Sequence, residues 1–321
     1  MTDAPRLKAK VVLLDGDAQQ RQHIATLCQD IGLDALQPAP QDVLAVLDQH
    51  KDLAGVLLSD DVPFADGGGV QLALQVHKQR PELPLFLRRS SDQSLSAAEH
   101  AAVRHQWAAP DMAALQAAIE RSIFSLLYPP SLVEGIVALT TTSLRSMFPN
   151  AVLEVEPPYV VHDRIIHGEV STLIALESTW CRGYMMLQTE EHALRQGVVQ
   201  GLSFGAAEGD LDFRELNNLL GETTNLIWGA FKNRYIPPQA FANQQTQVPI
   251  VINHAHQYIS FGSPDPQLCI RYHLKDAQRP QALPLTIVQR FIFNLHWSPE
   301  QFTEYSASAG DAGNTGELDL F

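Results

Sequence analysis

In residues 1–128, short apolar runs alternate with segments whose apolar residues recur every three to four positions. The apolar runs have the length of buried strands: KVVLLD, LAGVLLS and LPLFLRR. The periodic segments are typical of helices: AQQRQHIATLCQDIG, GGVQLALQVHKQR and DMAALQAAIERSIFSLL. Strands and helices in alternation predict an α/β domain, with a parallel sheet covered by helices on both faces.

The pattern changes after Tyr128, where two prolines end the last helix of this series. Residues 129–296 combine three predicted helices: SLVEGIVALTTTSLRSMF, TEEHALRQGVVQGL and DFRELNNLLGETTNLIWGAFKNRY. Strand-like runs lie between and after them: AVLEVEPPYVV, IIHGEVSTLIALES, CRGYMMLQ, QVPIVINHA, QYISFGS and PQLCIRYHL. This mixture predicts a second domain of the α+β class with a largely antiparallel sheet.

Residues 297–321 form the third predicted part of the chain. They are mostly small, polar and acidic, a composition typical of a disordered tail. The tail ends in LDLF, residues 318–321, a pattern that also serves as a short docking motif.

The 321-residue chain has a net charge of −14, which disfavours nucleic acid as a partner because phosphate contacts need a basic surface. The N-terminus carries no secretory signal, and no stretch approaches the roughly 18 apolar residues that span a membrane. The three cysteines, Cys28, Cys181 and Cys269, lie far apart without a CxxC pair, which predicts reduced, buried thiols. We therefore expect a cytoplasmic protein with no membrane partner.

Residues 8–128 resemble the receiver domain of two-component response regulators, a flavodoxin-like fold. VVLLDGDAQQR is similar to the first strand and acidic turn of that family, and VLLSDDVPFADGGG to its third strand and the loop beyond. LPLFLRRSS and WAAP are similar to the fourth strand and to the end of the fifth. The resemblance implies a phosphoacceptor aspartate four residues before Pro63, but that position holds Ser59.

The other chemical positions of the receiver family also differ in this chain. The acidic pair that holds Mg²⁺ corresponds to Asp15 and Gly16, the switch Ser/Thr to Arg88, and the lysine before the last loop's proline to Ala109. A depleted carboxylate cluster holds Mg²⁺ poorly, and a serine hydroxyl cannot form an acyl phosphate.

Asp60 and Asp61 are the alternative acceptors. Counted back from Pro63, Asp60 lies one residue after the acceptor position. A shift of one residue turns a strand side chain to the other face of the sheet, which disfavours Asp60 as the acceptor. We therefore expect a pseudo-receiver that serves docking or dimerisation.

The last of the three helices in residues 129–296 divides into two sides at about 100° per residue. The side expected in the core carries Leu216, Leu219, Leu220, Thr223, Leu226, Ile227, Ala230 and Phe231. The opposite side carries Glu222 and Asn225, with Asn218 one turn earlier and Gly221 and Gly229 flanking them. Any solvated helix face shows polar residues opposite an apolar stripe, so the spacing alone does not establish a site.

NLLGETTNLIWGAFKN followed by QVPIVIN resembles the CheX branch of the CheC/CheX/FliY phosphatase family, within a similarity over roughly residues 131–295. Members carry a Glu, two residues and then Asn on a helix, followed by a Gly and later by a proline-led strand. These positions are Glu222, Asn225, Gly229 and Pro249. Four residues before the glutamate, where the family often has Ser or Asp, this chain has Asn218.

The resemblance implies an aspartyl-phosphate phosphatase that acts on a separate, phosphorylated CheY-type receiver. It implies that Asn225 orients water, that Glu222 pairs with the receiver's lysine, and that Mg²⁺ belongs to the substrate receiver, with no cofactor or metal of this chain's own. It also implies a homodimer. Two alternatives stay open: a non-enzymatic adaptor of two-component or chemosensory signalling, and a ligand sensor that works through the arginine-bearing receiver site.

Three other patterns in the sequence lead to no site. His254 and His256 form an HxH pair of the kind that binds zinc on a strand, but no third ligand with suitable spacing is evident. DGGG at 66–69 lacks the following Gly-Lys-Ser/Thr of a phosphate loop, and no GxSxG elbow of a hydrolase is present.

Overall fold

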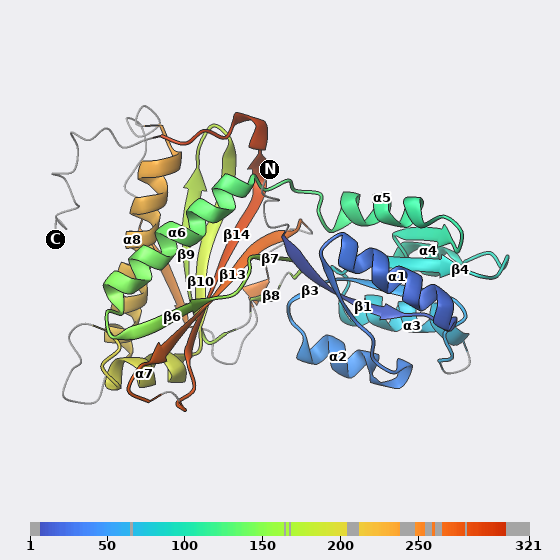
Figure 1. Cartoon of the computed structure of the whole chain (residues 1–321), viewed down its shortest axis with the longest axis horizontal. Helices are drawn as coiled ribbons and strands as arrows, with labels where there is room; N and C mark the ends of the chain where they lie inside the picture. The colour runs from blue at the N-terminus through green and yellow to red at the C-terminus, as the bar shows by residue number, and fades with distance from the viewer. Residues whose placement is uncertain are drawn as a thin grey trace.

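The computed structural model describes residues 7–64, 67–163, 165–166, 168–203, 212–237, 248–253, 259–260, 265–279 and 281–305. Figure 1 shows two halves side by side, with α1–α5 around one set of strands and α6 and α8 lying across another. None of the described helices is both long and apolar enough to cross a membrane.

Five strands of the first half form a parallel sheet in the order β2-β1-β3-β4-β5. This is the doubly wound order of flavodoxin-like folds, so the predicted α/β class is confirmed. The strands are β1 (Lys8–Leu14), β2 (Leu33–Leu36), β3 (Leu53–Ser59), β4 (Leu85–Arg89) and β5 (His105–Ala108). The helices are α1 (Ala18–Asp30), α2 (Val43–Gln49), α3 (Gly68–Gln79), α4 (Ala97–Ala102) and α5 (Met112–Ser122), with a 3₁₀ turn η1 (Pro40–Asp42).

The central strand β3 shows why this sheet forms. All seven of its residues are buried, as expected for a strand covered by helices on both faces. Helix α1 starts at Asp17, whose side chain accepts hydrogen bonds from the backbone of Gln19 and Gln20 and so satisfies two free N–H groups.

The second half is α+β and largely antiparallel, as predicted. Its main strands lie in the order β11-β9-β10-β14-β13, and β6 and β7 both pair with β13. The strands are β6 (Ala151–Val155), β7 (Tyr159–Val161), β8 (Ile165–Ile166), β9 (Val170–Glu177), β10 (Cys181–Thr189), β11 (Ile250–Asn253), β12 (Ile259–Ser260), β13 (Gln267–Asp276) and β14 (Leu285–Trp297). The helices are α6 (Pro130–Met147), α7 (Glu191–Val199) and α8 (Phe213–Tyr235), with a 3₁₀ turn η4 (Pro299–Gln301).

Helices α6 and α8 pack together and cover the antiparallel sheet (Figure 1). Aromatic rings fill the space below α8: Trp180 lies 6.3 Å from Phe231, and Phe231 lies 5.8 Å from Phe291 and 5.0 Å from Tyr235, centroid to centroid. These large rings bury much apolar surface, which fixes α8 on the sheet.

Strand β7 joins the two halves into one sheet. It pairs in parallel with β1, through Lys8–Tyr159 and Ala9–Val160, and antiparallel with β13 on its other edge. The backbone N–H of His162 then donates to the carbonyl of Leu53 at the start of β3 (3.1 Å). The join therefore lies at the amino ends of the parallel strands, opposite the receiver-like site.

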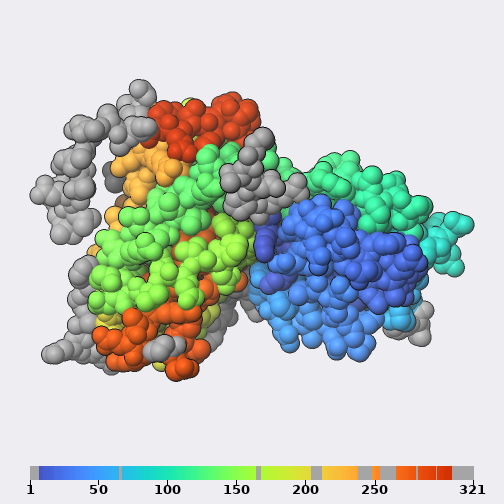
Figure 2. Space-filling view, in the orientation of Figure 1, coloured from blue at the N-terminus to red at the C-terminus, as the bar shows by residue number. Residues whose placement is uncertain are grey.

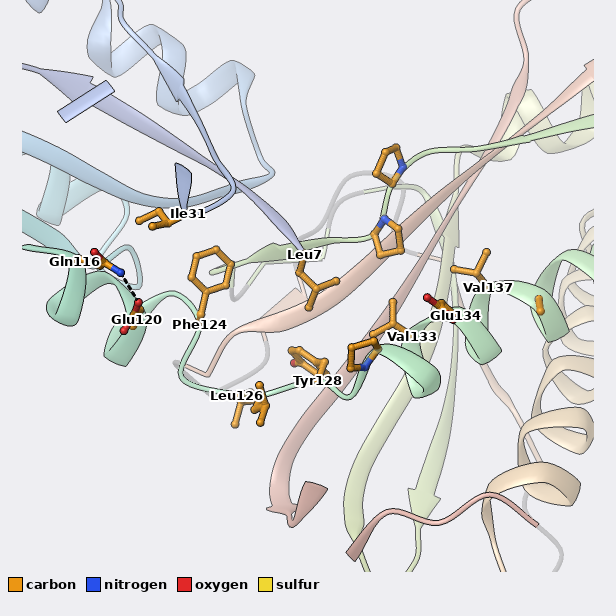
Figure 3. A pocket seen from close by; sticks show the side chains of 15 residues that line it. Leu7, Ile31, Gln116, Glu120, Phe124, Leu126, Tyr128, Val133, Glu134 and Val137 are labelled. Carbon is orange, nitrogen blue, oxygen red and sulfur yellow. Dashed lines mark hydrogen bonds between the residues drawn. The ribbon is translucent and has the colours of Figure 1, made fainter. Parts of the chain in front are cut away.

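Side-chain packing reinforces this join. Tyr128 is buried, its ring lies tilted against those of Phe293 and Trp297, and its hydroxyl donates a hydrogen bond to the carbonyl of Pro266 (3.1 Å). One hydrophobic cluster runs from β1 and α5 of the first half into α6, α8 and β14 of the second. Figure 2 shows the two halves in contact. A cleft of about 620 Å³ lies at their boundary, and Leu7, Phe124 and Leu126 are among the residues that line it (Figure 3).

The beginning of the expected disordered tail is part of this fold. Trp297 belongs to β14, and the ring of Phe302 packs edge-on against Trp180 at 5.1 Å. The N–H of Tyr305 donates to the carbonyl of Arg234 (2.8 Å), and Glu304 pairs with the Arg234 guanidinium (3.1 Å). The predicted start of a tail at 297 is therefore too early, because residues 297–305 cover the C-terminal end of α8. LDLF lies outside the described residues.

The three cysteines are buried and unpaired, as predicted. Burial raises the pKa of the Cys28 and Cys181 thiols to about 12 and that of Cys269 to about 11. Thiols with such pKa values are not nucleophiles at neutral pH.

Candidate functional site

Helix α8 has a well-defined start. The Asp212 side chain accepts from the N–H of Glu215, and the Glu215 carboxylate accepts from the N–H of Asp212, both at 2.9 Å. This reciprocal capping box satisfies two orphan donors. Lys232 and Arg234 lie in the last turn, where the helix dipole favours positive charge. The sequence thus fixes both ends of the helix that carries the candidate pair.

Glu222 and Asn225 are exposed on the same face of α8, with Asn218 exposed one turn earlier. Neither Glu222 nor Asn225 makes a hydrogen bond or an ion pair within the described part of the chain. A side chain added at Gly229 would meet nothing within 4 Å, and one added at Gly221 would only touch Val251 at 3.9 Å. The face is therefore accessible to another molecule, because neither glycine has a side chain that would project from it.

The buried stripe of α8 is rotated relative to the predicted one. Leu226, expected in the core, is 41% exposed, whereas Thr224 and Trp228 are buried. The Thr224 hydroxyl lies 2.6 Å from that of Thr172 on β9, because α8 packs against β9–β11 as well as against α6. The rotation leaves Glu222 on the side opposite the core, so the predicted exposure of the pair is unaffected.

The receiver-like site lies at the carboxyl ends of β1, β3 and β4, where ligands bind in doubly wound folds. The Arg88 guanidinium donates to both oxygens of Asp15 at 2.6 Å and to Asp61 at 2.9 Å. Arg88 and Asp15 are both buried. The hydrogen bonds that Arg88 donates to Asp15 raise the pKa of Arg88 further above its usual value, although burial alone would lower it.

Gly16 and Ser59 complete this network. The N–H of Gly16 donates to the Ser59 hydroxyl and to Asp61, both at 3.2 Å, and the Ser59 hydroxyl donates to Asp61. A Cβ at residue 16 would lie 2.7 Å from an Asp61 oxygen, so no larger residue fits this arrangement. The departures at residues 16, 59 and 88 are thus parts of one closed cluster, in which a guanidinium supplies the positive charge. Ala109, in the turn after β5, adds no polar side chain to it.

Asp60 points away from this cluster. Its side chain is 4% exposed and accepts hydrogen bonds from the backbone and hydroxyl groups of Ser90 and Ser91, and from Arg89. Burial by itself would raise the pKa of Asp60, but the bonds from Ser90 and Ser91 outweigh it and lower the pKa to about 2. Asp60 therefore fastens the loop after β4 to the end of β3.

The sequence identified the residues of this cluster by their departure from a family pattern, but it did not indicate that they bond to one another. The only signal available was the DD pair at 60–61, which offers two carboxylates to Arg88 and Arg89. Within the described residues, no group of three or more His, Cys, Asp or Glu side chains is arranged to hold a metal ion. His254 and His256 lie outside those residues.

Comparison with known proteins gives matches only among solved structures. No protein-family model matches the chain, and no curated protein matches it. A putative chemotaxis protein from Desulfovibrio vulgaris Hildenborough is 18% identical over 50% of this chain and 94% of its own, with a TM-score of 0.38. The chemotaxis protein CheX from Desulfovibrio desulfuricans is 19% identical over 49% of this chain and 96% of its own, with a TM-score of 0.37.

The other kind of match is to receivers. A response regulator receiver domain protein from Clostridium thermocellum is 17% identical over 36% of this chain and 95% of its own, with a TM-score of 0.33. Each of these solved structures is similar to half of this chain or less.

Proposed function

We propose that the second half of this protein removes the phosphoryl group from the aspartyl phosphate of a separate CheY-type receiver, in chemotaxis-like signalling. The observation that carries the proposal is the exposed pair of Glu222 and Asn225 on an open face of α8. The spacing of this pair and of Gly229 is that of the CheX motif, which supports the same reaction.

The chemistry of the two side chains suits this reaction. Hydrolysis of an acyl phosphate needs a water molecule held in line with the scissile P–O bond. The Asn225 carboxamide both donates and accepts hydrogen bonds and has no charge that repels phosphate. Glu222, one turn away, is placed to pair with the lysine of the substrate receiver. Mg²⁺ arrives bound to that receiver, so this chain supplies only position and orientation.

The substrate in this proposal is another protein. Figure 1 shows α8 on the side of the second half that lies away from the first half, so the pair does not face the chain's own receiver-like site. That site carries Ser59 in place of an acceptor, and Arg88 already engages Asp15. The first half thus acts in docking or dimerisation rather than as a phosphorylated receiver, and we expect the protein to be a homodimer.

Phosphate release from acyl-phosphorylated receivers of the same cell tests the proposal. We expect the full chain to accelerate release from at least one receiver by about tenfold or more over its intrinsic rate. The double variant Glu222→Gln/Asn225→Ala, in which both changes lie on an exposed face, is the matched inactive control. If no receiver loses phosphate faster while some bind, the protein is an adaptor and not a phosphatase.

A further inference from the structure

A second cleft between the halves, of about 440 Å³, lies where β1 and the turn after α2 face β7, β10, β13 and β14. Its charged walls come from both halves. Four cations, Lys10, Lys51, Arg271 and Arg290, and two carboxylates, Asp52 and Glu190, line it. Four positive minus two negative charges leave an excess of +2 among the lining residues, and Glu156, which pairs with Arg271, reduces it to +1, in a chain whose net charge is −14. A positive cleft in an acidic protein attracts anions.

Two of the cations are neutralised by the protein itself. Lys10 pairs with Asp52 at 2.6 Å, and Arg271 lies 3.8 Å from the same carboxylate. Arg271 also pairs with Glu156 at 2.9 Å and lies over the Tyr159 ring, 5.2 Å from its centroid. Among these contacts, the one between Arg271 and Asp52 crosses from one half to the other, and together they hold one wall of the cleft in place.

Arg290 is different. It is 93% buried, since its exposure is 7%, and its Nη1 donates only to the amide oxygen of Gln267 (3.2 Å). Its Nε is buried without an acceptor, and no carboxylate of the described residues lies within 4.0 Å of it. A buried guanidinium with an unused donor and no counter-charge is costly. Lys51, half-buried at the same cleft, likewise has no partner among the residues that the structure describes.

We propose that this cleft binds a small phosphorylated molecule, whose phosphate is neutralised by Arg290 and Lys51. Two unpaired cations match the charge of a phosphate monoester, which is close to −2 at neutral pH. The volume falls within the range of about 300–1,000 Å³ that is usual for small-molecule sites and exceeds what inorganic phosphate fills. Tyr159, Val161 and Val288 line the remaining space and give an organic group an apolar surface. The ligand would touch both halves, and the site is independent of Glu222 and Asn225.

Isothermal titration of the full-length protein with inorganic phosphate, AMP and adenosine tests this proposal. We expect phosphate and AMP to bind and uncharged adenosine not to bind. Affinity for AMP at least tenfold above that for phosphate identifies an ester as the preferred ligand, and equal affinities identify the free anion. Absence of heat with both phosphate and AMP overturns the proposal.

Variants locate the site. Arg290→Met and Lys51→Gln should each weaken phosphate or AMP binding at least tenfold, and Lys51→Gln, at a half-buried turn position, keeps the test valid if the change at Arg290 disturbs folding. Arg182→Met removes an exposed arginine, which pairs with Glu177 on β9, and is the matched control. If Lys51→Gln and a folded Arg290→Met both bind as tightly as wild type, the anion lies elsewhere and the proposal is contradicted.

Discussion

In the receiver-like half, the guanidinium of Arg88 binds carboxylates at the place where a receiver would use them to bind a metal ion. It bonds to both oxygens of the buried Asp15 and to one oxygen of Asp61, whose side chain is partly exposed. The individual departures from the receiver pattern were readable from the spacing of the sequence. Their mutual bonding was not, because it depends on how the turn after β3 directs Asp61 toward Gly16.

Arg88→Met tests the structural part of this account. Removing one partner leaves the buried Asp15 carboxylate without a counter-charge, which typically costs about 3–5 kcal/mol of unfolding free energy. Urea denaturation of the variant measures this loss. Asp15→Asn/Arg88→Met removes both charges and should recover a large part of it. A loss below about 1 kcal/mol in Arg88→Met would show that the pair contributes little.

Asp60 contributes stability that the protein loses as the pH becomes acidic. The folded-state pKa of Asp60, about 2, is below the ordinary value of 3.8, so the ionised form is stabilised by folding. Its contribution of ~2 kcal/mol is complete above pH 3.8 and is lost as pH falls toward 2. Urea midpoints of wild type and Asp60→Asn between pH 2 and 5 should converge at the acid end. A constant difference over that range would contradict this assignment.

Among the elements, α8 was the easiest to predict, because a 3.6-residue period and the capping pair of Asp212 and Glu215 mark it clearly. Leu226 was placed wrongly, since periodicity gives the relative positions of side chains but not which neighbours a helix packs against. The long strand β14 was not among the predicted strands, because burial alternates only from Leu285 to Gln289 and is continuous from Gln289 to Phe293, so no single period runs along it.

Gly229→Leu tests whether the open face of α8 receives a partner. A side chain at this position meets nothing within 4 Å, and leucine favours a helix over glycine by up to about 1 kcal/mol, so the variant should be as stable as wild type or more so. We expect binding of the phosphorylated receiver to weaken by about tenfold or more, because the added side chain lies beside Asn225. Surface plasmon resonance measures this affinity.

The control is Asn233→Leu, at an exposed position one turn beyond Gly229 on the same helix. It adds a similar side chain and should leave the affinity unchanged. Equal affinities of Gly229→Leu and wild type would mean that partners do not approach this face.

On the scale of the whole molecule, the two halves are one body. Strand β7 pairs with β1 on one edge and β13 on the other, and Tyr128 packs into the second half. A change of fold class near residue 128 was readable from the sequence. The shared sheet was not, because a three-residue strand has no periodic pattern, and because its two partners lie more than 100 residues away in opposite directions along the chain.

Tyr128→Ala tests this joint. Loss of a buried aromatic side chain typically costs about 3–5 kcal/mol, and here the cavity lies between the halves. We expect the variant to unfold in one transition, as wild type does, with its midpoint at a lower urea concentration. Far-ultraviolet circular dichroism and tryptophan fluorescence should coincide, since Trp107 reports on the first half and Trp180, Trp228 and Trp297 on the second. Two separated transitions in the wild type would contradict a shared core.

The central claim concerns Asn225. Single-turnover phosphate release from a phosphorylated receiver that binds this protein should be about 100-fold slower with Asn225→Ala than with wild type, at unchanged affinity, because only the orientation of water is lost. Asn233→Ala, an exposed asparagine of the same helix, should behave as wild type. If Asn225→Ala releases phosphate as fast as wild type, the exposed face of α8 is not the catalytic surface.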